Sequence, residues 1–140
     1  MKQIIKTDYL GKVYQVNKFI EEINKAAKII RKFKRKNPFD AIAFTGTSGA
    51  AFAYPLSYKL GIPLICIRKS VTDNHFRRKV EGQVNTKRYI IVDDFIESGK
   101  TIRRIQKEIK NNWAAKPPQL IGIYLYAQSY PYYELVPLIK

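Results

Sequence analysis

Two adjacent carboxylates, Asp93 and Asp94, precede a short run of small and hydroxyl-bearing residues at 98–101, which reads Ser-Gly-Lys-Thr. Residues 89–92 before the pair are apolar, which predicts a short strand buried on both faces. Beyond residue 101, isoleucines recur at helical spacing, so the loop leads into a helix. Loop amides and hydroxyls at the positive end of a helix can hold a phosphate. The carboxylates can accept hydrogen bonds from ribose hydroxyls, so the stretch predicts a mononucleotide site.

This stretch resembles the 5-phosphoribosyl-1-diphosphate (PRPP) motif of the type I phosphoribosyltransferases. That motif is an apolar strand, a pair of acids, a few variable residues and then Thr/Ser-Gly-x-Thr, and residues 98–101 match its last part position by position. The resemblance implies that Asp93 and Asp94 hold the ribose hydroxyls and help to place Mg2+ together with PRPP. The residues that it assigns to the 5-phosphate are Ser98, Gly99, Lys100 and Thr101.

Two other interpretations of the stretch are weaker. Residues 99–101 read Gly-Lys-Thr, as at the end of a P-loop, but a P-loop needs a glycine where this chain has Asp94. An ordinary strand–helix connection with a capping Ser98 would leave two acids at a buried strand end. Buried charges without a partner are costly, which argues against that connection.

Glu97 bears on the acceptor base. It stands where the 6-oxopurine enzymes of the resembled family carry an acidic residue that is thought to assist proton transfer at the base. A carboxylate beside a leaving proton can act as a general base, and the alternative is a solvated loop glutamate. Those enzymes also place a lysine at the start of the last strand, whereas here Lys116 comes just before Pro-Pro-Gln at 117–119. The resemblance therefore favours a purine, with a 6-oxopurine only slightly ahead of adenine.

A second strand–loop–helix unit comes earlier in the chain. Residues 39–44 read as a strand, residues 45–49 as a turn of small residues, and residues 50–60 as a helix closed by Gly61. In the resembled family, the loop after the first core strand binds diphosphate through its backbone amides. The residues in that position here are Thr45, Gly46, Thr47, Ser48 and Gly49.

Cations and a polar segment follow the next predicted strand, residues 62–67. Arg68 and Lys69 stand at the strand end, where the family often has basic residues for the diphosphate; an ordinary exposed pair is the alternative. Residues 70–87 form a long polar segment, and the equivalent segment in this fold is a flexible catalytic lid that often contains a hairpin. Residues 78–84 would allow that hairpin. The residues assigned to the lid are His75, Arg77, Arg78 and Lys79.

The chain carries a formal net charge of +15, from 26 Lys and Arg against 11 Asp and Glu. Such an excess suits nucleic acid, an anionic membrane or small phosphorylated substrates. Much of it lies in a predicted helix that Asn17 can cap and that stops before Asn37-Pro38. A solvated face is the simpler interpretation of these cations, because no aromatic residues are interleaved with them as they tend to be in single-strand binders.

Strands that alternate with helices predict an α/β fold with a doubly wound, mostly parallel sheet. We expect residues 1–140 to form a single type I phosphoribosyltransferase-like domain with a minimal hood, because few residues outside 37–127 are left for the base-recognising subdomain. No apolar run approaches the length of a membrane span, so no membrane partner is expected. The single cysteine, Cys66, and an N-terminus without a signal peptide indicate the cytoplasm.

The resemblance implies a phosphoribosyltransferase that moves 5-phosphoribosyl from PRPP to a nitrogenous base and releases diphosphate, with Mg2+ as the cofactor. The expected partners are PRPP and a nucleobase, and the expected assembly is a homodimer. The alternative is a PRPP-sensing regulator of the same fold that binds RNA or DNA through its basic surface. Base-dependent release of diphosphate would distinguish the enzyme from the regulator.

Overall fold

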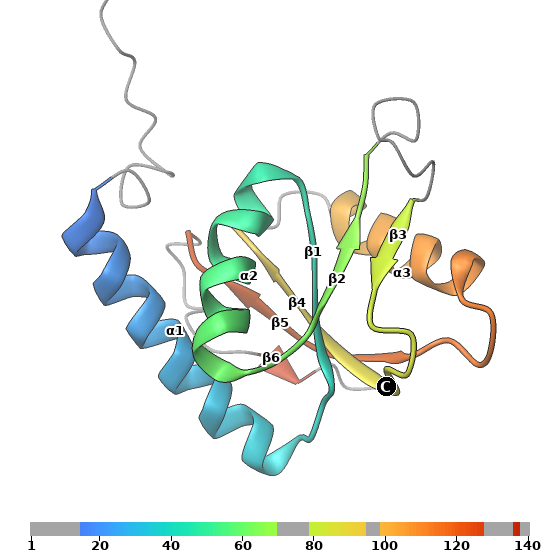
Figure 1. Ribbon diagram of the computed structural model, residues 1–140, viewed down its shortest axis with the longest axis horizontal. Coiled ribbons are helices and arrows are strands. Elements are labelled where there is room, and N and C mark those ends of the chain that lie inside the picture. Colours follow the sequence, from blue (N-terminus) through green and yellow to red (C-terminus); the bar gives the residue numbers. More distant parts are fainter. Residues whose placement is uncertain (1–14, 70–78, 95–98, 128–135, 138–140) are drawn as a thin grey trace, which may run out of the picture.

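The computed structural model describes residues 15–69, 79–94, 99–127 and 136–137. Helices and strands follow one another along these ranges (Figure 1). The helices are α1 (Val16–Lys36), α2 (Gly46–Leu60) and α3 (Lys100–Asn112). The strands are β1 (Ala41–Thr45), β2 (Leu64–Ile67), β3 (Val80–Gly82), β4 (Arg88–Asp93), β5 (Gln119–Leu125) and β6 (Val136–Pro137).

The strands form one sheet in the order β3-β2-β1-β4-β5-β6. β1 pairs in parallel with β2 and with β4, and β4 pairs in parallel with β5. The outer strands β3 and β6 pair antiparallel with their neighbours. The predicted α/β fold with a mostly parallel sheet is therefore confirmed. β6 is a strand that the sequence did not indicate.

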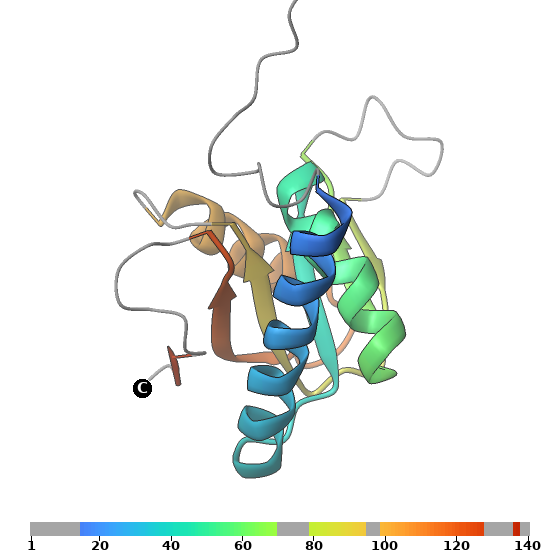
Figure 2. The ribbon, with the colours of Figure 1, turned by 90° about the vertical axis from the view of Figure 1, so that its left-hand side faces the viewer.

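Helices cover both faces of this sheet (Figure 2). On one face, Ile30 of α1 and Phe52 of α2 join Ile90 of β4 in one apolar cluster. On the other face, Ile105 of α3 packs in a second cluster that includes Ile91 of β4. Because neighbouring residues of β4 point to opposite faces, its apolar run is buried on both sides, as predicted.

Local sequence signals set the ends of the first two helices. The predicted Asn17 cap is wrong, because Gln15 is at the cap position and Asn17 lies inside α1, which begins at Val16. α1 ends at Lys36, as predicted, because Pro38 disfavours helical backbone in the residue before it. α2 ends where Gly61 adopts the left-handed conformation with φ +64°. Pro55 lies inside α2, and the helix continues beyond it.

The polar segment predicted over residues 70–87 contains part of the sheet. Its residues 80–82 form β3, which pairs antiparallel with β2. The predicted hairpin within residues 78–84 is therefore wrong, because the described residues there form a single strand whose partner is β2. Residues 70–78, with His75, Arg77 and Arg78, lie outside the described residues, as do residues 1–14, which the sequence left for the hood. None of the described helices is long and apolar enough to cross a membrane.

Candidate active site

The carboxyl ends of β1 and β4 form the topological switch point of the sheet. These two strands are parallel neighbours. The chain leaves β1 into α2, which packs on one face, and leaves β4 into α3, which packs on the other face. In open α/β sheets, ligands bind outside the carboxyl ends of the strands at such a point. The ends of β1 and β4, after which the sequence placed its two predicted loops, therefore lie side by side.

The turn predicted over residues 45–49 is wrong, because Thr45 ends β1 and residues 46–49 are the first turn of a helix. α2 begins at Gly46, where the sequence predicted a helix from Ala50. Gly46 has φ +66°, a conformation that suits glycine, so the chain passes from the strand directly into the helix. A Cβ on the buried Gly49 would lie 3.2 Å from the Cβ of Phe44, so the first turn packs closely on β1. Backbone N–H groups in a first turn lack partners within the helix, so this start is chemically suited to an anion.

The Thr45 hydroxyl connects the ends of two strands with α3. It donates a hydrogen bond of 2.7 Å to the carbonyl oxygen of Ile67, the last residue of β2. It also accepts a hydrogen bond of 2.9 Å from Nη2 of Arg104. Because both bonds engage this buried hydroxyl, Thr45 fixes the geometry of the switch point and does not cap α2 with its side chain.

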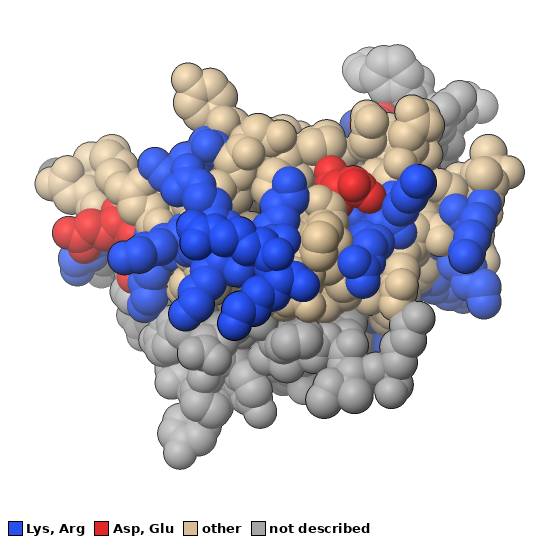
Figure 3. All heavy atoms as spheres, turned by 90° about the horizontal axis from the view of Figure 1, so that it is seen from below, with Lys and Arg blue, Asp and Glu red and all other residues tan. Residues whose placement is uncertain are grey.

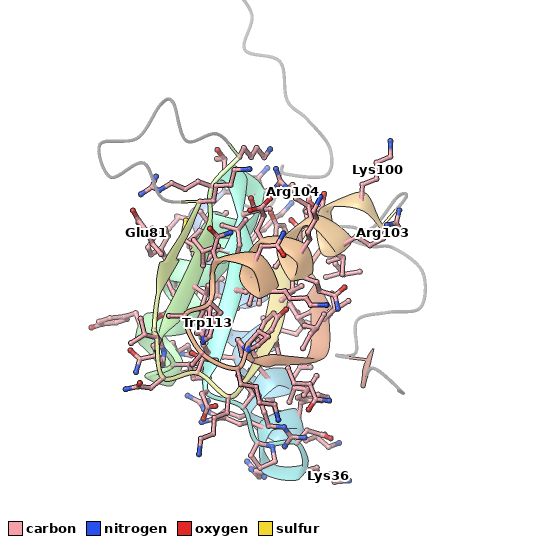
Figure 4. The ribbon with its side chains drawn as sticks, turned by 90° about the vertical axis from the view of Figure 1, so that its right-hand side faces the viewer. Lys36, Glu81, Lys100, Arg103, Arg104 and Trp113 are labelled. Atoms are coloured by element: carbon pink, nitrogen blue, oxygen red, sulfur yellow. The ribbon has the colours of Figure 1, made fainter. Side chains whose placement is uncertain are left out.

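Arg104 is a site residue that the sequence did not reveal. It lies next to the buried Ile105 in α3, and its side chain reaches the end of β1 (Figure 4). Within the described part of the chain, its only hydrogen-bond partner is the neutral Thr45 hydroxyl, so its charge is not offset by a described carboxylate. The one signal in the sequence was that Arg104 is next to Ile105 and so lies at the edge of the apolar stripe of α3, whereas Lys107 lies farther from it. That position alone does not identify Arg104 as a site residue.

The two cations after β2 point to different places. A Cβ on Gly46 would lie 3.2 Å from Nζ of Lys69, so the Lys69 ammonium lies at the start of α2. Arg68 pairs instead with Glu81 of β3, with 2.8 Å between Nη2 and Oε2. The Nε atom of Arg68 is buried and has no hydrogen-bond partner among the described residues. Lys69 therefore reaches the predicted diphosphate site, and Arg68 is held at the sheet edge.

Asp93 and Asp94 lie buried at the end of β4, with 5% and 9% of their surface exposed. The Asp94 amide donates a hydrogen bond of 2.9 Å to Oδ1 of Asp93. Burial raises the pKa of Asp93 to about 7; the Asp94 carboxylate adds to the rise, and a hydrogen bond from the Ser48 side chain opposes it. Asp93 therefore gains or loses its proton near neutral pH, while the pair offers acceptors to a hydroxyl-rich ligand.

Ser48 joins the start of α2 to the strands beside it. Its carbonyl oxygen accepts a hydrogen bond of 2.7 Å from the Tyr126 hydroxyl. The neighbouring Gly49 packs against β4, because a Cβ there would lie 3.4 Å from the Val92 carbonyl oxygen. The Tyr126 ring stacks on Phe52 of α2, with 3.7 Å between ring centroids and 2° between ring planes. The first turn of α2 is thus fixed to the end of β4 and to the residue that follows β5.

The predicted 5-phosphate loop is described from Gly99 onward. Gly99 has φ +77° and precedes α3, and its carbonyl accepts a hydrogen bond of 3.0 Å from the Arg103 amide. A Cβ on Gly99 would lie 3.1 Å from Nη1 of Arg103, so a guanidinium lies against the loop. Lys100 and Thr101 occupy the first turn of α3. Glu97 and Ser98 lie outside the described residues, and their roles stay predictions.

Lys79, assigned to the lid, lies at the start of the β2–β3 pairing. Its carbonyl accepts a hydrogen bond of 2.7 Å from the Arg68 amide. Its ammonium pairs with Glu108 of α3, with 3.5 Å between Nζ and Oε1. In this arrangement Lys79 links the sheet edge to α3.

The carboxylates at the switch point are suitable ligands for Mg2+ that binds together with a phosphorylated substrate. Among the described residues, no three His, Cys, Asp or Glu side chains gather as a metal site. Asp93 and Asp94 supply two adjacent carboxylates. Proteins bind Mg2+ mostly through one or two carboxylates together with substrate phosphates, so this pair is an adequate protein contribution.

The sequence profile of the family PRTase-CE matches residues 3–134. An orotate phosphoribosyltransferase from Pyrobaculum islandicum is 32% identical over 65 residues, which make up 46% of this chain and 34% of that protein. The chain thus spans about a third of the length of this curated relative.

Solved structures show the same fold. UMP synthase from Leishmania donovani has a TM-score of 0.64 and 21% identity, over 88% of this chain and 25% of that one. Orotate phosphoribosyltransferase from Aeropyrum pernix has a TM-score of 0.64 and 14% identity, over 89% and 67%. Adenine phosphoribosyltransferase from Thermoanaerobacter pseudethanolicus has a TM-score of 0.60 and 19% identity, over 89% and 76%.

Proposed function

The chain belongs to the PRTase-CE family of type I phosphoribosyltransferases, and on this premise we propose that it transfers 5-phosphoribosyl from PRPP to a nitrogenous base and releases diphosphate. The close approach of the α2 start to the end of β4 carries the proposal, because a Cβ on Gly49 would lie 3.4 Å from the Val92 carbonyl oxygen, directly before the buried acids. A ligand that spans both parts needs an anionic end and a sugar with free hydroxyls. PRPP has both.

Each end of PRPP has its own protein groups in this proposal. The diphosphate accepts hydrogen bonds from the backbone amides of residues 46–49, and the ammonium of Lys69 and the guanidinium of Arg104 lie beside these amides. The ribose hydroxyls donate hydrogen bonds to the carboxylates of Asp93 and Asp94. The 5-phosphate binds to residues 98–101, which lead into α3. Arg68 would join the diphosphate only by leaving Glu81.

The reaction breaks the bond between ribose C1 and a diphosphate oxygen and forms a bond between C1 and a base nitrogen. Positive charge develops on the ribose ring, so catalysis comes mainly from positioning and from stabilising the departing diphosphate. Lys69, Arg104 and the α2 amides stabilise that leaving group. When bound, Mg2+ supplies further positive charge for the diphosphate. Glu97 accepts the proton that the base nitrogen loses.

The acceptor base is the least constrained part of the proposal. Glu97 favours a purine, with a 6-oxopurine slightly ahead of adenine, and this would place the protein in purine salvage. The relatives above are an orotate and an adenine phosphoribosyltransferase by name. Both of those bases therefore belong among the candidates. The homodimer and the cytoplasmic location are likewise proposals, and sedimentation velocity would test the homodimer.

Diphosphate release tests the proposed function. The protein is incubated with PRPP, Mg2+ and, in turn, adenine, hypoxanthine, guanine, xanthine, uracil and orotate. We expect release that depends on one or a few of these bases. Glu97→Gln should lower turnover more than PRPP affinity, because a general base acts on the chemical step. Tight PRPP binding without release for any base would favour the regulator and overturn the enzyme.

A further inference from the structure

The exposed cations of α1 form a surface far from the switch point. Figure 3 shows Lys and Arg side chains gathered in one patch on the face seen from below. Figure 4 places Lys36 at the opposite end of the molecule from Lys100 and Arg104. The exposed cations in the second half of α1 are Lys28, Arg31, Lys32, Lys34, Arg35 and Lys36. PRPP at the switch point does not use this charge.

Neither nearby acids nor the helix dipole accounts for the whole patch. The acids of α1, Glu21 and Glu22, lie in its first half. Asp40 lies just beyond the helix, and its Oδ2 accepts hydrogen bonds from the backbone amides of Lys87 and Arg88, at 2.9 Å and 3.1 Å. Cations in the last turn complement the helix dipole, but that effect fades within one turn. It therefore leaves Lys28 and its neighbours at 31 and 32 unexplained.

An apolar groove between α1 and α2 opens beside these cations. It measures about 280 Å3, and Phe19, Ile20 and Ile23 line one side while Pro55 and Tyr58 line the other. Tyr58 is 94% exposed, which is unusual for an aromatic ring that lines an apolar groove.

The groove runs into the cationic row of α1. Asn24 lines the groove, and Lys28 follows it one turn later on the same side of the helix. Lys59 of α2 also lines the groove, so a second cation flanks Tyr58. The sequence alone showed no aromatic residues among the cations, because Tyr58 comes from a different helix.

We propose that this α1/α2 face binds single-stranded nucleic acid, with one base stacked on Tyr58 and the phosphates along Lys28, Arg31 and Arg35. An aromatic platform next to a cationic track is the usual construction of single-strand sites. Lys28 to Arg35 spans about 10 Å of helix. That length corresponds to roughly three phosphates of an ordered strand. This proposal is independent of the proposed enzyme function, because the groove and the cations of α1 share no residue with the switch point.

Charge and burial favour this occupant over others. A second copy of the chain would bring the same cations against the patch, and like charges repel. A membrane-surface helix buries its apolar face in lipid, whereas the apolar stripe of α1 is buried in the core, with Ala27 and Ile30 fully inaccessible. Duplex DNA would match the cations but would leave the Tyr58 groove without a base to stack.

Fluorescence anisotropy with the full chain tests the proposal. The probes are labelled 20-nucleotide oligo(dT) and oligo(rU) and a labelled 20-base-pair duplex, at salt concentrations from 50 to 200 mM. We expect at least one of the two single strands to bind more tightly than the duplex. If oligo(dT) binds more tightly than oligo(rU), the preferred nucleic acid is DNA, and in the opposite case it is RNA. Tyr58→Ala should weaken single-strand binding about 5- to 150-fold, and Tyr58→Phe should keep it, because the ring does the stacking.

Matched triple variants separate this surface from general charge. Lys28→Gln with Arg31→Gln and Arg35→Gln should reduce the slope of log K against log salt by about 2, since each single-strand phosphate contributes about 0.7. Lys107→Gln with Lys110→Gln and Lys116→Gln removes the same charge elsewhere and should leave the slope unchanged. Circular dichroism checks that each variant is folded.

Several results would overturn the proposal. Equal losses from the two triple variants would mean that net charge alone drives binding. Preference for the duplex, or unchanged binding by Tyr58→Ala, would remove the stacking site. Sedimentation that shows a dimer dissociated by Tyr58→Ala, without single-strand binding, would assign the groove to self-association. The stabilisation by PRPP should persist in the α1 variants, so failure of this proposal is distinguishable from failure of the enzyme.

Discussion

The two strand–helix junctions at the switch point share one backbone device. Each helix start has a glycine with a positive φ. Gly46, the first residue of α2, has φ +66°, and Gly99, the residue before α3, has φ +77°. At each glycine a Cβ would lie close to a cation, 3.2 Å from Nζ of Lys69 or 3.1 Å from Nη1 of Arg103. The two junctions thus share three features that suit a phosphate: a left-handed glycine, a helix start and a cationic side chain.

The residues at the ends of the strands make the junctions different. β1 ends in Thr45, whose neutral hydroxyl is engaged by Ile67 and Arg104. β4 ends in the buried carboxylates of Asp93 and Asp94. The first junction therefore has features that suit an anion, whereas the second adds acceptors that suit sugar hydroxyls. This difference is the reason that the proposed function gives the diphosphate to the β1–α2 junction and ribose 5-phosphate to the β4–α3 junction.

Removing both acids should produce the largest change. Asp93→Asn with Asp94→Asn should remove most of the stabilisation by PRPP and Mg2+, which is about 2.7 kcal/mol when the ligand is at 100 times its Kd, and leave only the part that the diphosphate contributes. The measurement is thermal unfolding with and without ligand. Glu21→Gln removes an exposed acid of α1 and serves as the control. A double variant that keeps the full shift would contradict the assignment of the ribose to β4.

Arg104 should matter at the other junction. Arg104→Gln removes a charge and the bond to Thr45, so diphosphate binding with Mg2+ should weaken about tenfold, in the range of a charged hydrogen bond. Arg104→Lys should recover part of that loss because it keeps the charge. Isothermal titration calorimetry measures both, with Lys107→Gln as the control on the same helix. Equal affinities for wild type and Arg104→Gln would limit Arg104 to a structural role.

The two glycines should respond alike. Gly46→Ala and Gly99→Ala each place a side chain in left-handed backbone, at a cost of about 1–2 kcal/mol in the free energy of unfolding. Urea denaturation measures that cost. Gln106→Ala, on the exposed side of α3, is the control. Ser57→Ala is not a suitable control, because the Ser57 hydroxyl donates a hydrogen bond to the Ile62 carbonyl oxygen. If either glycine tolerates alanine without loss, the shared device does not hold at that junction.

The pH dependence of stability should show the smallest effect. Asp93 has a pKa of about 7 in the folded protein against 3.8 as its ordinary value, so the folded state holds a proton that the unfolded state has lost. This group therefore stabilises the fold at low pH and loses that contribution as pH rises through 7. Between pH 6 and 8 the free energy of unfolding should fall by about 1 kcal/mol. Asp93→Asn should remove this decline in urea denaturation, and an unchanged decline would point to another group.

Local patterns allowed the order of the elements to be predicted. The isoleucines at 102, 105 and 109 repeat at helical spacing, and all three are buried in α3. The start of α2 was missed because its small residues have weak helix propensity. That turn forms through tertiary packing, with Gly49 against Phe44 and against the Val92 carbonyl.

The long-range contacts of the site did not follow from the sequence. Arg104 meets Thr45 across 59 positions of the chain, and no local pattern connects them. The pairing of Arg68 with Glu81 depends in the same way on how β3 aligns with β2. The motif at 98–101 indicated what kind of ligand to expect, and the fold showed which side chains stand around it.

The central claim is that the two junctions bind the two ends of one PRPP molecule. The direct measurement is the melting temperature with Mg2+ and PRPP, diphosphate or ribose 5-phosphate. PRPP should raise it more than either half does. The double variant of Asp93 and Asp94 should lose the ribose 5-phosphate shift alone, and Lys69→Gln with Arg104→Gln the diphosphate shift alone. The absence of any shift for the wild type at millimolar PRPP would contradict the claim.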